Sequence, residues 1–155
     1  MEFAEIKNTI LSFEDLLSER MKRYIHYKSM RNFVVHFDEI QGALTRGKII
    51  KLLSSYIEDV RAKDYDFSDK EEGLQLARKY MPTLSGYFKD ESNFMAKPSL
   101  KLILVTGIIA DGALYITGLS SSIFHIPLVT IVLLLYYFFI VVFKEPKGRV
   151  YGIFY

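Results

Sequence analysis

The sequence predicts an all-α protein in which a small cytoplasmic helical domain is followed by a C-terminal two-helix transmembrane hairpin. Three observations support this prediction. Apolar residues recur every three or four positions through residues 1–81, as they do along one face of a helix. Two nearly uncharged apolar runs follow within residues 99–143. The charged residues are concentrated in the first part of the chain. Residues 1–97 contain 16 Lys/Arg and 16 Asp/Glu, whereas residues 98–155 contain 4 Lys/Arg and 2 Asp/Glu.

Charge balance and the absence of cysteine limit the function classes. A neutral first part gives no general electrostatic reason to bind nucleic acid, which is therefore not an expected partner. Without cysteine the chain has no disulfide framework, no thiol nucleophile and no thiolate metal site. The first residues are amphipathic and include Glu2, Glu5 and Glu14, unlike a signal or targeting peptide. We therefore expect the apolar runs themselves to direct the chain to a membrane.

The first predicted helix covers residues 3–29. Its apolar positions follow helical spacing opposite a charged face and are Phe3, Ile6, Ile10, Phe13, Leu17, Met21 and Tyr24. Ser12, with Asp15 three residues later, is an internal capping signal, so a break at that point is the alternative.

Three further helices complete the predicted domain of residues 1–81. Residues 32–47 keep helical spacing but also alternate as in a strand, and we favour a helix that ends at Gly47. Residues 48–62 repeat the amphipathic pattern. Ser68 and Glu71 have the spacing of a capping box, which predicts a short fourth helix that ends at Met81, before a proline.

Residues 82–98 mix Pro, Gly and Ser with aromatic residues and are predicted to form a linker that partly lies along the membrane surface. The two apolar runs cover about 100–119 and 126–143, and about 20 residues are needed to cross roughly 30 Å of hydrocarbon. A pair of buried core helices is the alternative. A soluble domain of 155 residues could hardly cover two helices that are apolar on every face, so the membrane hairpin is favoured.

Basic residues set the expected orientation of the hairpin. They flank its two ends as Lys97, Lys101, Lys144, Lys147 and Arg149, whereas the connecting sequence SSSIFH has no Lys or Arg. By the positive-inside rule both termini face the cytoplasm, together with a basic-aromatic tail at residues 144–155. The expected location is a bacterial inner membrane.

Asp111, within the first apolar run, is the sharpest candidate for a functional residue. It lies 12 residues beyond Ser99, about 18 Å along a helix and close to mid-membrane. Gly107, Tyr115 and Gly118 share its helical face, and Thr130, Tyr136 and Tyr137 are its candidate partners.

Two roles for this carboxyl group are open. In the favoured one, Asp111 is a neutral hydrogen-bond donor that fixes helix packing or assembly. In the alternative, it handles a proton or cation in an oligomer, in the manner of ion-carrying rotor rings.

A second group of candidates is basic. The stretch RMKRYIHYKSMR carries five cations that could contact lipid headgroups or a protein partner: Arg20, Lys22, Arg23, Lys28 and Arg31. A solvated helix face is the commoner outcome for such a pattern. Lys144, Lys147 and Arg149, which follow the second run, are further candidates for lipid or partner contact.

No motif predicts catalysis, a metal or a cofactor. His26, His36 and His125 lack the four-residue spacing of a helical metal site. The serines have no nucleophile-elbow context, and no glycine loop suited to phosphate is present. We therefore expect a protein that is not an enzyme and has neither a metal site nor a cofactor.

These features predict a non-catalytic integral membrane subunit or adaptor of a membrane protein complex. Its expected partners are membrane lipid and other membrane protein subunits, identical or different. One alternative is a homo-oligomeric channel or pore former, holin-like or a defence effector, with Asp111 in the conduction or gating path. Another is a membrane immunity or regulatory protein.

Overall fold

The computed structural model describes residues 1–67, 69–117 and 127–152. The chain divides into two compact units. The helical unit comprises residues 1–96 together with 149–152, and the hairpin unit comprises residues 97–148. Both units are mainly helical, as the sequence predicts.

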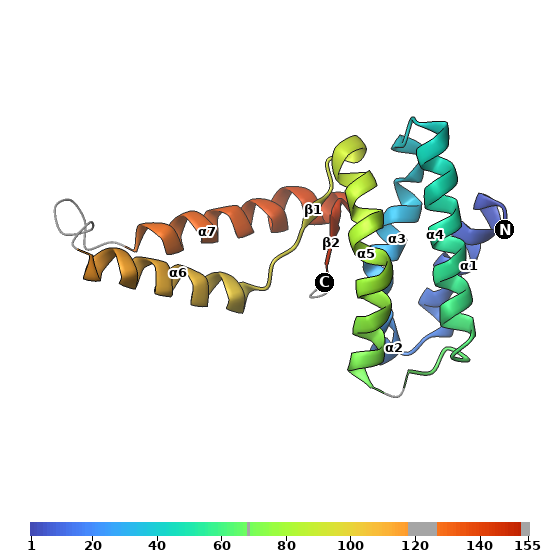
Figure 1. Ribbon diagram of the computed structural model, residues 1–155, viewed down its shortest axis with the longest axis horizontal. Helices are drawn as coiled ribbons and strands as arrows, with labels where there is room; N and C mark the ends of the chain where they lie inside the picture. Colours follow the sequence, from blue (N-terminus) through green and yellow to red (C-terminus); the bar gives the residue numbers. More distant parts are fainter. Residues whose placement is uncertain (68, 118–126, 153–155) are drawn as a thin grey trace. The chain divides into compact units, whose positions relative to one another are not determined.

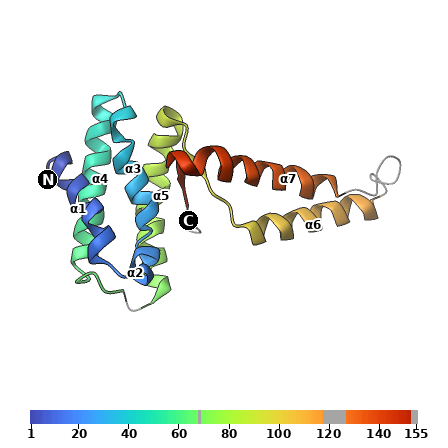
Figure 2. The same ribbon diagram turned by 180° about the vertical axis from the view of Figure 1, so that it is seen from behind.

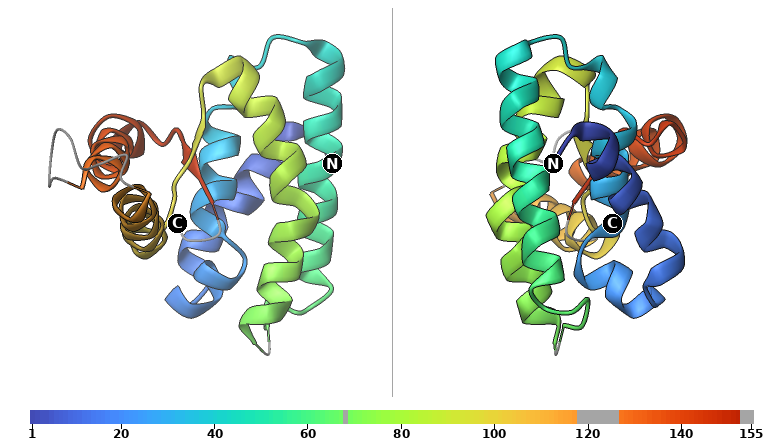
Figure 3. Two further views of the ribbon diagram at one scale, coloured as in Figure 1. Left: turned by 60° about the vertical axis from the view of Figure 1, so that its left-hand side comes forward. Right: turned by 90° about the vertical axis from the view of Figure 1, so that its right-hand side faces the viewer.

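The described part of the helical unit contains five α-helices, a 3-10 turn and two short strands, with α4 and α5 side by side (Figures 1 and 3). In chain order these elements are α1 (Phe3–Leu16), α2 (Glu19–Tyr24), α3 (Tyr27–Val35), η1 (Phe37–Glu39), α4 (Ala43–Arg61), α5 (Lys70–Ser92), β1 (Met95–Ala96) and β2 (Val150–Tyr151). The hairpin unit contains α6 (Leu100–Ile116), α7 (Leu128–Phe139), the π-helical turn η2 (Ile140–Lys144) and the 3-10 turn η3 (Glu145–Lys147).

The predicted first helix, residues 3–29, is three helices in the structure. Ser18 begins α2, because its side-chain oxygen accepts a hydrogen bond from the Met21 amide at 3.3 Å. His26 has a φ of 55°, a left-handed conformation that a continuing helix does not contain. The expectation of one continuous helix is therefore wrong, and the breaks lie after the weak capping signal at Ser12.

The next predicted helix boundary, at Gly47, is also wrong. Gly47 lies inside α4, which begins at Ala43. The chain instead turns earlier, through η1, where Phe37 and Ile40 are 1% and 0% exposed. Burial of these two side chains fixes the turn, because each buried apolar side chain of this size contributes about 2 kcal/mol.

The prediction of a helix end at Met81 and a linker from residue 82 is wrong as well, because α5 continues through Pro82 to Ser92. Asp69 caps its start by accepting a hydrogen bond from the Glu72 amide at 3.0 Å; Ser68 of the expected capping box lies outside the described residues. Pro82 is exposed, whereas Leu84 and Phe88 beyond it are fully buried. This apolar stripe continues the helix despite the missing proline amide.

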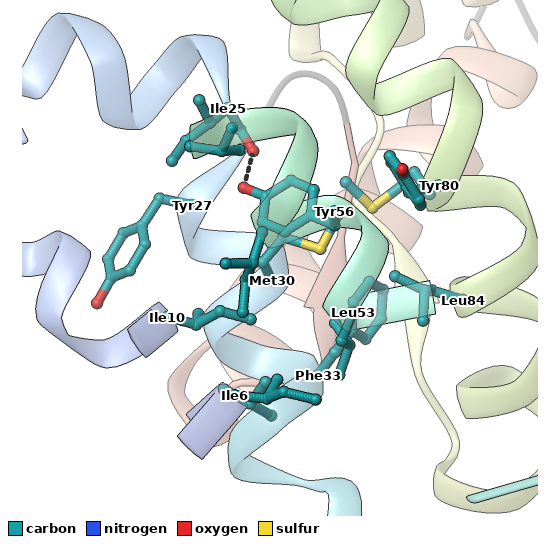
Figure 4. Packing of buried hydrophobic residues seen from close by; sticks show 14 of the residues in the cluster. Ile6, Ile10, Ile25, Tyr27, Met30, Phe33, Leu53, Tyr56, Tyr80 and Leu84 are labelled. Atoms are coloured by element: carbon teal, nitrogen blue, oxygen red, sulfur yellow. Dashed lines mark hydrogen bonds between the residues drawn. The ribbon is translucent and has the colours of Figure 1, made fainter. Parts of the chain in front are cut away.

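The core of the helical unit is formed by side chains from four helices (Figure 4). Ile10 of α1, Met30 of α3, Tyr56 of α4 and Leu84 of α5 are all fully buried. The Tyr56 hydroxyl donates a hydrogen bond to the Ile25 carbonyl at 2.7 Å. This bond satisfies the one polar group that the tyrosine brings into the core.

Residues on either side of the hairpin unit are joined within the helical unit. Strands β1 and β2 pair in parallel, with Met95 opposite Val150, and the Met95 amide donates to the Arg149 carbonyl at 3.1 Å. Asn32 donates to the Val150 carbonyl at 2.8 Å, and Val150 is 0% exposed. The segment that follows the hairpin is therefore part of a folded core, although the sequence suggested a tail at 144–155.

His26 predicts an acid-sensitive stability. Its side chain is 4% exposed and its Nδ1 has no hydrogen-bond partner among the described residues. Burial, together with the charge of Lys70, lowers the pKa of His26 from 6.5 to about 4. The unfolded chain therefore binds more protons between these values, and stability should fall by about 2 kcal/mol from about pH 7 to pH 5. Urea unfolding at a series of pH values measures this loss.

A pair of histidine variants separates His26 from the other titrating groups. His26→Gln should flatten the stability profile in that pH window. His36→Gln, which alters a histidine that contacts Glu39 at 2.8 Å, should keep the decline. An equally steep profile in His26→Gln and the wild type would assign the acid sensitivity to other groups.

Candidate functional site: a helical hairpin with a carboxylate cap

Helices α6 and α7 lie side by side and antiparallel in the hairpin unit (Figures 1 and 2). The buried residues of the two helices are few: Ile103 and Gly107 on α6 and Thr130 on α7. Nearly every other side chain of the two helices is exposed or half-buried.

Gly107 sets the close approach of the two helices. A Cβ at this position would lie 2.6 Å from Thr130 Oγ1 and 2.9 Å from Thr130 Cα. No side chain larger than hydrogen fits at that distance, so α6 presents bare backbone to α7. Small residues allow this kind of backbone contact between apolar helices.

Asp111 caps the start of α7 from the neighbouring helix. Its Oδ1 accepts a hydrogen bond from the Val129 amide at 2.9 Å. Its Oδ2 accepts from the Thr130 amide at 3.0 Å and from the Thr130 hydroxyl at 2.6 Å. Helix α7 has Pro127 at its N-cap, and no side-chain cap of its own. The carboxylate thus satisfies amides that a helix N-terminus leaves unpaired, at the positive end of the helix dipole.

The geometry gives Asp111 the role of an acceptor, because both backbone amides can only donate. This differs from the neutral hydrogen-bond donor that the sequence predicts at this position. Of the other predicted residues on its face or opposite it, only Gly107 and Thr130 join this contact. Tyr115 and Tyr136 are 68% and 43% exposed, Tyr137 is half-buried, and Gly118 lies outside the described residues.

The opposite end of the hairpin is closed by an ion pair. Lys97 Nζ contacts both carboxylate oxygens of Glu145 at 2.7 Å. The two side chains are 17% and 30% exposed. The hairpin unit is therefore fixed at one end by this pair and at the other by the Asp111 cap, with the glycine contact between them.

The outward faces of both helices are apolar and exposed. Ile109 and Ile116 of α6 are 67% and 85% exposed, and Leu135 and Phe138 of α7 are 63% and 61% exposed. Soluble monomers rarely expose continuous apolar surface of this extent, and such surfaces mark contact with a membrane or a protein.

One helix in the described part of the chain is long and apolar enough to cross a membrane, the stretch Leu128–Lys147 formed by α7, η2 and η3. Helix α6 has 17 residues, about 25 Å at 1.5 Å per residue, which is shorter than a typical span. The predicted run of 100–119 is helical to Ile116, and residues 118–126 lie outside the described part. Helix length alone therefore supports one span.

The five predicted cations near the N-terminus do not form a single charged face. They are distributed over two helices, with Arg20, Lys22 and Arg23 on α2 and Lys28 and Arg31 on α3. Lys22 contacts Glu14 at 3.2 Å and Glu19 at 2.9 Å. Acidic neighbours therefore neutralise part of this cluster.

The three predicted cations after the second run have different environments. Lys144 and Lys147 belong to the hairpin unit, whereas Arg149 belongs to the helical unit. The Arg149 guanidinium donates to Glu39 at 2.8 Å, so it attaches the returning chain to the helical unit. Among the described residues, no group of three His, Cys, Asp or Glu side chains is placed to hold a metal ion.

Removing the cap should weaken the hairpin in proportion to the acceptors lost. Asp111→Ala removes all three hydrogen bonds and should destabilise the hairpin by about 1–2 kcal/mol. Asp111→Asn keeps one acceptor oxygen and should cost less than half of that. Thermal unfolding in mild detergent, followed by circular dichroism, measures both changes. If the alanine variant were as stable as the wild type, the cap would not contribute to the stability of the hairpin.

Comparison with known proteins gives no match among family models, curated proteins or solved structures. No activity or partner therefore transfers to this chain from a relative. The exposed apolar faces of the hairpin and the contacts that close its two ends are the basis for a functional proposal.

Proposed function

We propose that the protein is a non-catalytic membrane subunit or adaptor. The hairpin unit inserts into the bilayer as two helices, and the helical unit stays on the cytoplasmic side, where it contacts other proteins. The observation that carries this proposal is the exposure of apolar side chains on the outward faces of both α6 and α7. Water is a poor environment for such a surface, and lipid is a good one.

Pairing of the segments that flank the hairpin supports two crossings instead of one. A single spanning helix would separate Met95 from Val150 by a bilayer, yet these residues pair in β1 and β2. Asn32 and Glu39 hold the returning segment on the same helical unit. If α7 crosses the membrane, α6 and the connecting segment must carry the chain across first. The pairing therefore supports two crossings, whereas the length of α6 by itself does not.

The helix lengths also revise the depth expected for Asp111. Leu128 to Phe143 is 16 residues, about 24 Å of helix, which approaches the hydrocarbon thickness of roughly 30 Å. Asp111 contacts the first turn of α7. With the Lys97–Glu145 pair at the cytoplasmic headgroups, the proposal puts the carboxylate between the bilayer centre and the far interface. A charge costs less there than at the centre.

The contacts of Asp111 favour the packing role over ion handling, since both carboxylate oxygens are occupied by the start of α7. Ion flux into vesicles that contain the purified protein tests this preference. Asp111→Asn should leave flux at the level of empty vesicles, as the wild type does. A wild-type flux that the substitution abolishes without loss of assembly would favour the channel alternative.

Membrane insertion is tested with matched leucine substitutions. Leu135→Glu places a charge on α7 at a position that is 63% exposed and should cost about 3 kcal/mol of insertion free energy. Leu44→Glu is the control, because Leu44 is 75% exposed on the helical unit. Wild type and Leu44→Glu should stay in the membrane pellet after an alkaline wash, and Leu135→Glu should be partly extracted. A soluble wild-type chain would overturn the proposal.

Orientation is tested by cysteine labelling, which the cysteine-free chain makes specific. Ser121→Cys, in the segment that connects α6 and α7, should react with an impermeant reagent from outside the cell. Lys48→Cys, on the exposed face of α4, should react only after lysis. The reverse pattern would contradict a cytoplasmic helical unit.

The adaptor role is tested by affinity purification of the full chain in mild detergent, followed by measurement of complex mass and identification of its components. A stable complex with a different membrane protein supports the adaptor role. A ring of identical chains would favour the pore-forming alternative.

A further inference from the structure

The ion-paired end of the hairpin unit carries an excess of positive charge. Its basic residues are Lys97, Lys101, Lys144 and Lys147, and its acidic residue is Glu145. The Lys97 ammonium contacts both oxygens of Glu145, so this acid is largely compensated by one lysine. Residues 97–101 and 144–148 together therefore carry a formal charge of +3, from four lysines and one glutamate.

These lysines border apolar surface. Lys101 and Lys147 are exposed, Lys144 is half-buried, and neither Lys101 nor Lys144 forms an ion pair within residues 97–117 and 127–148. Leu102 is the next residue after Lys101, and Phe143 directly precedes Lys144; these apolar side chains are 56% and 54% exposed. A partner that satisfies both features carries negative charge directly beside apolar groups.

We infer that this end of the hairpin binds the anionic headgroups of membrane phospholipids, with the lysines on the phosphates and the flanking apolar side chains among the acyl chains. The inference rests on the proposed membrane function and specifies the lipid. An anionic phospholipid joins both required features in one molecule. A lysine near an anionic membrane surface contributes to binding through long-range attraction that salt screens.

The other predicted cation cluster does not share this pattern. In α2, Lys22 has two acidic partners and Arg20 donates to the Tyr24 hydroxyl at 3.0 Å. The hairpin lysines are distinguished by their position next to exposed apolar helix ends. The expected lipid preference therefore arises from the hairpin.

Flotation with lipid vesicles tests the inference. The full chain is synthesised in a cell-free system with vesicles of phosphatidylcholine alone or of phosphatidylcholine mixed with phosphatidylglycerol. The wild type should float with both, and more with phosphatidylglycerol at low salt. The triple variant Lys101→Gln, Lys144→Gln, Lys147→Gln should lose this excess. Each lysine is expected to contribute about fivefold to the vesicle-binding constant, and the three together up to about 100-fold. Its matched control is Lys48→Gln, Lys51→Gln, Lys89→Gln, exposed lysines of the helical unit.

The outcomes separate the inference from the proposed function. Retention of the excess in the control variant, and its loss in the hairpin variant or at high salt, supports the inference. Equal flotation of the wild type with both vesicle types overturns the inference while membrane insertion stands. Equal loss in both triple variants also overturns it, because net charge would then account for the preference. No flotation with either vesicle type overturns the proposed function itself.

Discussion

Replacing Gly107 with alanine should force α6 and α7 apart and destabilise the hairpin by about 3 kcal/mol. The new Cβ would lie 2.9 Å from Thr130 Cα, and backbone cannot move aside as a flexible side chain can. Overpacking of this kind costs about 1–3 kcal/mol. Separation of the helices would also stretch the three hydrogen bonds from Val129 and Thr130 to Asp111. Thermal unfolding in mild detergent should show the loss.

Gly112→Ala is the matched control for this prediction. Gly112 lies on the same helix, and a Cβ there meets no atom within 4 Å. Alanine at Gly112 should leave stability unchanged or raise it by up to about 1 kcal/mol, because alanine favours helix more than glycine does. Equal effects of the two substitutions would mean that the close contact with Thr130 does not determine hairpin stability.

Replacing Gly73 with alanine should destabilise the helical unit by about 3 kcal/mol. A Cβ at Gly73 would clash directly with the Tyr24 carbonyl group, since it would lie 2.9 Å from the Tyr24 carbonyl carbon and closer still to its oxygen. The first turns of α5 would have to move away from the end of α2, which disturbs the buried Ile25 and Tyr56 beside it. Urea unfolding of the full chain in detergent measures the change.

Gly86→Ala, on the same helix, provides the comparison. Gly86 is exposed and has open space at its Cβ position, so alanine should stabilise α5 by up to about 1 kcal/mol. Opposite signs for the two substitutions are expected. A neutral result for Gly73→Ala would show that α5 shifts away from α2 at little cost.

Amphipathic spacing predicts a helical first unit, but it reveals neither the number of its helices nor their ends. The apolar stripe of α1 runs on in register to Met21, so it could not reveal that Ser18 begins a new helix or that His26 adopts a left-handed conformation. Local propensity also failed at Pro82, where the buried residues beyond it keep α5 helical. Tertiary burial decided these boundaries, and a single sequence shows burial only through its pattern.

The candidate site was partly visible in the sequence. Asp111 is conspicuous as an acid in an apolar run, and Thr130 was among several candidate partners. The register of two antiparallel helices depends on their contact at Gly107, which no spacing within one helix specifies. One local signal was available, because α7 begins after Pro127 without a side-chain cap of its own and so needs an acceptor from elsewhere.

The β1–β2 pairing was not predictable, since β2 comprises two residues within a short basic and aromatic segment. Neither strand has the length or the alternation that identifies a strand in a sequence. The pairing depends on Asn32 and Met95, which lie far from Val150 along the chain.

The same pairing determines the order of events during synthesis. Val150 leaves the ribosome after both helices of the hairpin, yet it fills a fully buried position in a unit whose first residue is Met1. The bond from Asn32 to Val150 joins residues 118 positions apart. The first 96 residues can collapse early, but their core closes only once the hairpin has been translated. Completion of the helical unit therefore requires that both helices of the hairpin have already been synthesised.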